Sequence, residues 1–90
     1  MNPKISEFFW IEIYVYWNDH NPPHFHVLYN EYNCYISIKE LKILEWNLPP
    51  KIEKLVISWA ELYNEELLEA WTDAQNMKTP NKINPLFSKK

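Results

Sequence analysis

The three histidines of the chain, His20, His24 and His26, lie within seven residues of one another. They belong to the segment Asn18-Asp19-His20-Asn21-Pro22-Pro23-His24-Phe25-His26. Imidazole exchanges protons near neutral pH and also binds metal ions. The Asp19 carboxylate beside them can hold one imidazole in a single tautomer, and the two prolines stiffen the backbone by fixing φ at about −65°. Function is therefore predicted here, with His20, His24, His26 and Asp19 as the candidate catalytic residues.

The same segment can be interpreted as a metal site. Residues two apart on a strand point to the same side of a sheet, so His24 and His26 can act together. Glu31 follows His26 by five residues, a spacing found in some cupin-type metal proteins. Imidazole suits zinc, iron, nickel and copper, but cupins carry glycines around this motif and a second ligand-bearing segment that this chain lacks. The sequence assures no cofactor. It suggests a divalent metal, with His24, His26 and Glu31 as the candidate ligands, or all three histidines together with Asp19 or Glu31.

Two interpretations need no metal. In the first, His20 and His24 act as acid and base in RNA cleavage through the ribose 2′-OH, which requires two proton-transfer groups. The chain has neither glycine nor arginine, so a lysine, an imidazolium or backbone amides would have to stabilise the charge that develops on phosphorus. In the second, the histidines and asparagines only cap a turn that the prolines fix. Whether the protein is an enzyme stays open at this point.

The composition limits which binding partners and which cellular compartment the sequence predicts. A net charge of −3 without arginine lacks the electrostatic footprint of a nucleic-acid-binding protein. The single cysteine, Cys34, cannot form an intramolecular disulfide, and its strand position predicts a buried side chain. We expect a cytoplasmic protein, because no signal peptide or membrane-spanning stretch is apparent.

The first half of the chain predicts strands. Residues 6–17 form a nearly unbroken aromatic and β-branched run, typical of one strand. Residues 24–29 and 33–38 predict two more, joined by a turn at Asn30-Glu31 or Tyr32-Asn33, where Asn takes the left-handed conformation that Gly usually fills. Residues 41–46 are ambiguous between a brief strand and a half-turn. The aromatic first strand would also suit pairing with a second copy in a homodimer.

The second half predicts one long helix over residues 49–76, with Asn47 as N-cap before the two prolines. Apolar residues recur every three or four positions and include Trp59 and Trp71, which we expect in the core. A kink or second cap is allowed at Asn64. The tail, residues 77–90, would pack back through Ile83, Leu86 and Phe87. The predicted fold is α+β: one domain over residues 1–90, an antiparallel meander of about three strands against a long C-terminal helix, straight or kinked.

Strings along nearly the whole chain resemble a small bacterial family catalogued as domain of unknown function 4160. They are Ile5-Ser6-Glu7-Phe8-Phe9, Tyr16-Trp17 with the histidine segment that follows it, Leu44-Glu45-Trp46-Asn47-Leu48-Pro49, Trp59-Ala60-Glu61-Leu62, Glu65-Glu66-Leu67-Leu68 and Ile83-Asn84-Pro85-Leu86. This chain departs from the usual family pattern, because Asn30 to Asn33 and Trp46 stand where relatives typically have glycine. It also lacks the arginines that relatives usually carry.

The resemblance implies a partner rather than a reaction. Genes of this family commonly lie beside another small gene, in pairs regarded as toxin–antitoxin candidates, and no catalytic residue or cofactor carries over. We therefore expect a cytoplasmic bacterial protein that acts through a small protein partner encoded nearby and through its histidine-rich turn, with RNA as one candidate target that the sequence supports only weakly. The alternatives are a non-catalytic protein-interaction module and a histidine-based metal-binding protein.

Overall fold

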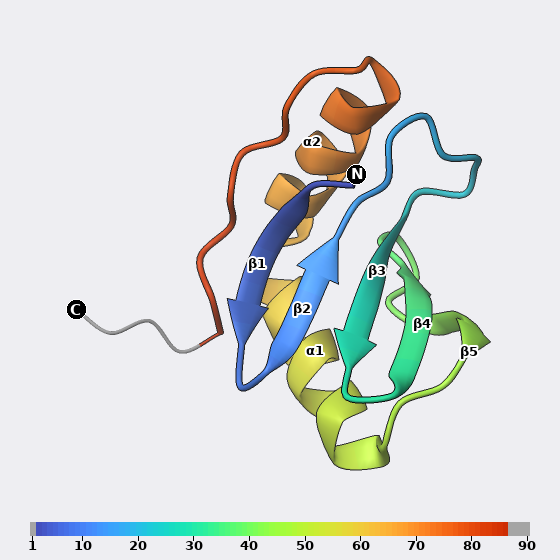
Figure 1. Ribbon diagram of the computed structural model, residues 1–90, viewed down its shortest axis with the longest axis vertical. Helices are drawn as coiled ribbons and strands as arrows, with labels where there is room; N and C mark the ends of the chain where they lie inside the picture. The colour runs from blue at the N-terminus through green and yellow to red at the C-terminus, as the bar shows by residue number, and fades with distance from the viewer. Residues whose placement is uncertain (1, 87–90) are drawn as a thin grey trace.

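The computed structural model describes residues 2–86 and places five antiparallel strands and two helices in them (Figure 1). Their bounds are β1 Lys4–Phe8, β2 Ile11–Tyr14, β3 His24–Tyr29, β4 Tyr32–Ser37, β5 Ile43–Trp46, α1 Pro50–Leu62 and α2 Asn64–Gln75. The strands form one sheet in the order β1-β2-β3-β4-β5. The α+β class and the antiparallel meander are confirmed. The expectation of three strands and one long helix is wrong.

The first error lies in residues 6–17, which form a hairpin instead of one strand. β1 and β2 are joined by Phe9 and Trp10, with Phe8 paired to Ile11 across the turn. Both turn residues have positive φ, 52° and 65°. Two-residue hairpin turns of this kind usually contain Asn or Gly, so two aromatic residues conceal the turn. After it, alternate residues Ile11, Ile13 and Val15 are fully buried, as a half-buried strand requires.

The second hairpin follows the prediction closely. β3 has the predicted bounds, and β4 begins one residue earlier than expected. The turn is Asn30-Glu31, and Asn30 takes a positive φ of 52°. Asn tolerates this conformation better than most residues because its short polar side chain can hydrogen-bond locally. The ambiguous segment 41–46 contains the strand β5.

The predicted long helix is broken at Tyr63, whose φ and ψ of −116° and 32° end α1. Asn64, the expected site of a kink, begins α2, and its Nδ2 donates to the carbonyl oxygen of Ile38 at 2.7 Å. Asn47 is not the N-cap. Pro49 occupies that position without a side-chain cap hydrogen bond, and Pro50 is the first helical residue, where its missing N–H costs nothing.

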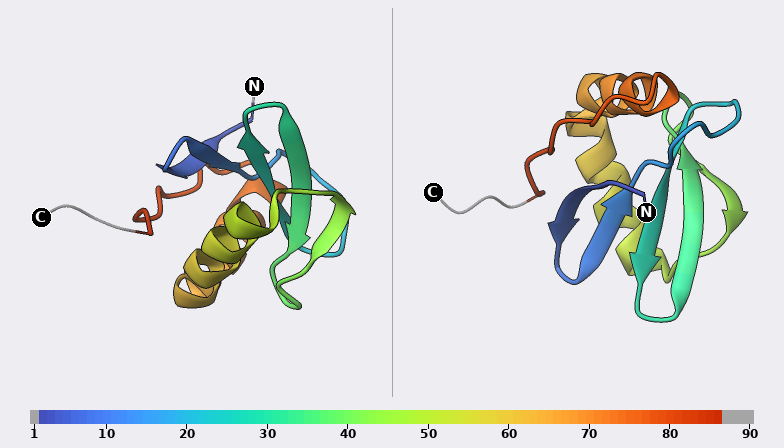
Figure 2. Two further views of the ribbon diagram at one scale, coloured as in Figure 1. Left: turned by 90° about the horizontal axis from the view of Figure 1, so that it is seen from below. Right: turned by 45° about the horizontal axis from the view of Figure 1, so that its top comes forward.

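The helices are placed differently against the sheet. α1 covers one face of the sheet, whereas α2 lies across the end from which residues 15–23 leave (Figure 2). Trp59 of α1 is fully buried, with its ring centroid 5.4 Å from Phe8 and 5.9 Å from Phe25. Trp71 and Cys34 are also buried, as expected.

The tail returns to the domain through three hydrogen bonds, one of which Lys82 Nζ donates to the Lys4 carbonyl at 3.0 Å. Ile83 donates its N–H to the Ile5 carbonyl at 2.7 Å, and Trp59 Nε1 donates to the Asn84 carbonyl at 2.8 Å. Ile83 is buried and Leu86 partly buried, as predicted, whereas Phe87 lies outside the described residues. Within residues 2–86, neither helix has the length and apolar character needed to cross a bilayer.

Candidate functional site

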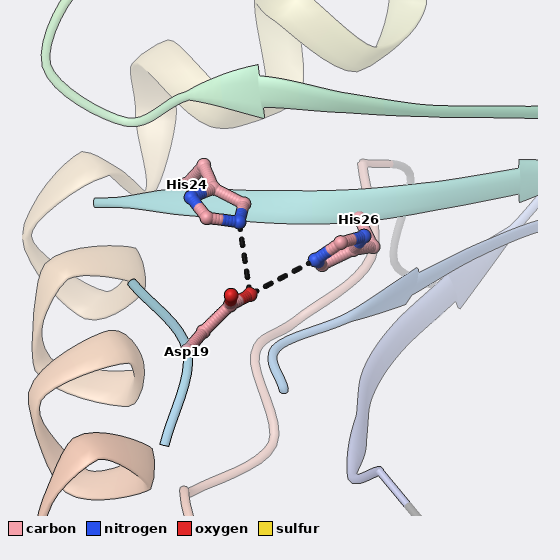
Figure 3. Close-up of side chains that lie close together, drawn as sticks. All are labelled: Asp19, His24 and His26. Atoms are coloured by element: carbon pink, nitrogen blue, oxygen red, sulfur yellow. Dashed lines mark hydrogen bonds and ion pairs between the residues drawn. The ribbon is translucent and has the colours of Figure 1, made fainter. Parts of the chain in front are cut away.

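The segment of residues 15–23 connects β2 to β3 and folds back over the first residues of β3. Asn18, which has a positive φ of 51°, donates its N–H to the Ala74 carbonyl near the C-terminal end of α2 at 3.3 Å. The Asn21–Pro22 peptide bond is cis. The connection brings the Asp19 side chain back toward two β3 side chains, those of His24 and His26 (Figure 3).

A single oxygen of Asp19 faces both imidazoles. Its Oδ2 lies 2.9 Å from Nε2 of His24 and 3.2 Å from Nε2 of His26. The other oxygen, Oδ1, accepts the backbone N–H of His20 at 2.8 Å. His24 is 2% exposed and His26 is 7% exposed, so these polar groups contact one another with little access to water. The three ligand atoms lie within 4.8 Å of one another.

The second nitrogen of His24 determines what the first can do. Its Nδ1 lies 2.6 Å from the carbonyl oxygen of Pro22. A carbonyl only accepts hydrogen bonds, so Nδ1 must carry the proton. In a neutral imidazole Nε2 then presents a lone pair toward the Asp19 oxygen, which is also electron-rich. A second proton or a cation is required between these two atoms.

Aromatic neighbours hold both imidazole rings in place. Tyr16 stacks on His26 with ring centroids 3.5 Å apart and planes 2° from parallel. His24 packs against Tyr35 of β4 and Trp71 of α2, at centroid distances of 4.7 Å and 5.0 Å. Rings packed on several sides cannot readily change rotamer, so the donor atoms are oriented in advance.

Burial and charge act in opposite directions on the ionisable groups. Burial lowers the pKa of His26 below its usual value, although the hydrogen bond with Asp19 opposes the change. For Asp19, burial alone raises the pKa, but hydrogen bonds from His20 and His26 and the charges of His24 and His26 together lower it. These directions favour a neutral His26 and an ionised Asp19, the forms that bind metals.

Four of the five predicted site residues lie close together, and Glu31 does not. Asp19, His24 and His26 form the group described above. The side chain of His20 is 81% exposed, its Nδ1 lies 3.1 Å from Asp19 Oδ1, and its ring centroid lies 5.8 Å from that of His24, so it borders the group on the solvent side. Glu31 lies in the β3–β4 turn, at the other end of β3 from His24. The carboxylate of the group is therefore Asp19.

The sequence did not identify the aromatic residues that pack against the two imidazoles. Tyr16 and Trp71 are ten and forty-five residues from His26 in the sequence, and only the fold brings them to the imidazoles. For Tyr16 a signal existed, because alternation places it on the face opposite Ile13 and Val15. For Trp71 the helical pattern indicated burial but gave no partner.

Two of the three donor pairs, those that share Asp19 Oδ2, have spacings found around a transition-metal ion, and all three donor atoms lie within 4.8 Å of one another. With metal–ligand bonds of about 2.0–2.2 Å, neighbouring donors are about 2.8–3.1 Å apart in octahedral sites and about 3.3–3.6 Å apart in tetrahedral sites, which together cover about 2.8–3.6 Å. The Asp19 Oδ2 distances of 2.9 Å and 3.2 Å to the two imidazoles lie within this range. Three protein ligands would leave at least one coordination position for water or substrate.

Comparison with known proteins gives a family but no activity. A family described as "Domain of unknown function (DUF4160)" matches residues 10–72, which is more than half of the chain and includes the whole site. No curated protein and no solved structure matches the chain.

Proposed function

Because the chain belongs to the DUF4160 family, whose description names no activity, we propose a function from the geometry: the protein binds one divalent transition-metal ion through Asp19, His24 and His26. The observation that carries the proposal is the 2.6 Å contact between His24 Nδ1 and the Pro22 carbonyl. Metal-binding histidines usually donate their other ring N–H to a carbonyl or carboxylate, which fixes the ring and its tautomer. His24 has this arrangement, and its free nitrogen points at a carboxylate.

The donor set selects the class of metal. Two imidazoles and one carboxylate suit iron(II), zinc and related first-row ions, whereas magnesium and calcium prefer oxygen ligands. The bound ion would act as a Lewis acid on a ligand in an open position, or lower the pKa of a bound water. Asp19 and His24, held from the backbone, would orient the ion, and the stacked Tyr16 would keep water from one face of His26.

The test is direct metal binding by protein purified without a histidine tag. We expect titration calorimetry to show one equivalent of zinc, or of iron(II) without oxygen, and no binding of magnesium. Asp19→Asn keeps the size of the side chain and should weaken zinc binding by about 100-fold, since it removes the charged ligand. The matched control is Glu31→Gln, which removes the carboxylate that sequence spacing suggested and should leave affinity unchanged. Failure of the native protein to bind zinc or iron(II), or equal effects of the two variants, would overturn the proposal.

The exposed aromatic side chains favour a second function, binding of a small protein partner. Trp10 is 83% exposed and Trp46 is 65% exposed, and exposed tryptophans are frequent anchors of protein interfaces. The neighbouring gene's product is the partner to test by co-purification. A Trp10→Ser, Trp46→Ser double variant should lose it, and Leu68→Ser, on α2, should retain it. The toxin–antitoxin role stays a prediction that rests on the family resemblance.

A further inference from the structure

A broad groove lies beside the group formed by Asp19, His24 and His26, which we call the histidine cluster. None of these three proposed metal ligands lines the groove. Its volume is about 610 Å³, and its walls include Pro3, Lys4, Tyr14, Tyr16, Trp17 and Leu28. Small-molecule sites in proteins are commonly about 300–1,000 Å³ and largely apolar, with a few polar groups. Three aromatic rings, a proline and a leucine make a surface suited to flat apolar molecules.

The groove and the cluster share side chains. Tyr16 lines the groove and stacks on His26, with ring centroids 3.5 Å apart. Tyr14 also lines the groove and is the direct cross-strand partner of His26 between β2 and β3. Two further lining residues are joined to each other: the backbone N–H of Trp17 donates a hydrogen bond to Asn2 Oδ1 at 3.2 Å. This bond fixes the N-terminal segment along the groove. The walls are therefore positioned by the sheet and by the packed site.

Charge determines which flat molecules the groove can accept. Lys4 is the one cationic residue among those that line it, and Lys4 Nζ lies 2.7 Å from Glu7 Oε1 and 4.0 Å from Glu12 Oε2. The Tyr14 hydroxyl also donates to Glu12, at 2.8 Å. One ammonium between two carboxylates leaves no free positive charge for an anion. A chain with net charge −3 and no arginine is also poorly suited to a phosphate backbone.

We propose that this groove binds a small, uncharged, planar aromatic ligand, stacked or packed against Tyr14, Tyr16 and Leu28. Binding does not require a metal at the histidine cluster, so this inference and the metal proposal can fail separately. Single-stranded RNA, whose bases also stack on aromatic side chains of a sheet, is the alternative occupant that the charges disfavour.

The test uses two fluorescent probes that differ by one sulfonate. N-phenyl-1-naphthylamine is uncharged, and 1-anilinonaphthalene-8-sulfonate adds a negative charge to the same rings. We expect saturable binding of the uncharged probe to the native chain, and binding of the sulfonate at least about tenfold weaker, since the groove offers no unpaired cation. A short single-stranded RNA at physiological salt should not displace the uncharged probe.

Variants locate the probe. Leu28→Glu places a charge on the partly buried groove wall and should weaken binding of the uncharged probe by about tenfold. Leu68→Glu, on the partly exposed surface of α2, makes the same chemical change and should alter it less than twofold. Circular dichroism checks that both variants fold. No saturable binding, equal binding of the two probes, equal effects of the two variants, or displacement by RNA would each overturn the proposal.

Discussion

The Asp19 carboxylate divides its two oxygens between holding the loop and facing the imidazoles. Oδ1 accepts the backbone N–H of the next residue, His20, at 2.8 Å, while Oδ2 lies within 3.2 Å of both Nε2 atoms. A backbone donor is present whatever side chain follows, so the exposed imidazole of His20 is not needed to orient the carboxylate. The His20 side chain is 81% exposed, so water screens its contact with Oδ1. His20 is therefore the least important of the three histidines for the site.

The types of the residues were enough to locate the site in the sequence. Which carboxylate joins the two imidazoles, Asp19 or Glu31, depends on distances along the strand. The sequence indicated Asp19, His24 and His26 because they lie close together in the chain and their side chains can transfer protons or bind metals. Glu31 was an alternative from motif spacing alone. A strand rises about 3.3 Å per residue, so five residues past His26 carry a side chain far beyond reach of the imidazoles. A connection that folds back over its own strand, as residues 15–23 do, has no comparable signature in sequence.

Cys34 gives a prediction that concerns one buried group. Burial raises the pKa of its thiol to about 12, against about 8.5 for an exposed cysteine. The native protein should therefore resist iodoacetamide at pH 8, and protein unfolded in guanidinium should react at one site, as mass spectrometry would show. Rapid alkylation of the native protein would contradict this.

The same pKa difference predicts how stability changes with pH. Above about pH 8.5 the unfolded chain releases the thiol proton, while the folded chain keeps it up to about pH 12. The stabilisation is complete below pH 8.5 and is lost as pH rises. Urea unfolding should show a fall of up to about 1.4 kcal/mol per pH unit between pH 9 and 11. Cys34→Ala should show a smaller fall. The difference between the two proteins is the contribution of the thiol, because lysine and tyrosine titrate in both.

At the scale of elements, the absence of glycine forces other residues into left-handed conformations. Seven of the described residues have positive φ: Phe9, Trp10, Asn18, Asn30, Leu41, Trp46 and Met77. Two are asparagines, which adopt it readily, and the other five each incur about 1–2 kcal/mol. These positions end or turn elements, so strain is concentrated where the chain reverses. This explains why residues 6–17 resembled one strand: the turn lacks the residues by which turns are recognised.

Trp10→Gly is predicted to stabilise the protein. Trp10 has a φ of 65° and is 83% exposed, so its removal relieves strain with little loss of packing. Relief of about 1–2 kcal/mol, less the entropy that glycine adds to the unfolded chain, leaves a net gain of about 0.5–1 kcal/mol in the free energy of unfolding. Urea denaturation measures it. Leu68→Gly, inside α2, is the control and should lose about 1 kcal/mol. Destabilisation by Trp10→Gly would show that the turn is not strained.

At the scale of the whole molecule, the histidine cluster lies where three parts of the fold meet. His24 and His26 belong to the sheet, Asp19 to the connection over it, and Trp71 and the Ala74 carbonyl to α2. α2 lies across the sheet's end (Figure 2) and also buries Leu67, Ala70 and Ala74 in the core that it shares with the sheet. An ion held by Asp19, His24 and His26 would therefore clamp the connection onto β3 and, through it, hold α2 in place.

This clamping predicts that metal stabilises the entire domain. A ligand that binds only the folded state at 100 times its dissociation constant adds about 2.7 kcal/mol to the free energy of unfolding. For a domain of this size each kcal/mol raises Tm by about 4–8 °C, so zinc should raise Tm by about 10–20 °C. Scanning calorimetry with zinc, with magnesium and with chelator measures the effect. Asp19→Asn should abolish the rise and Glu31→Gln should preserve it. A rise that is equal in both variants would mean that zinc binds elsewhere, and the cluster would then be a buried hydrogen-bonded network that fixes the fold.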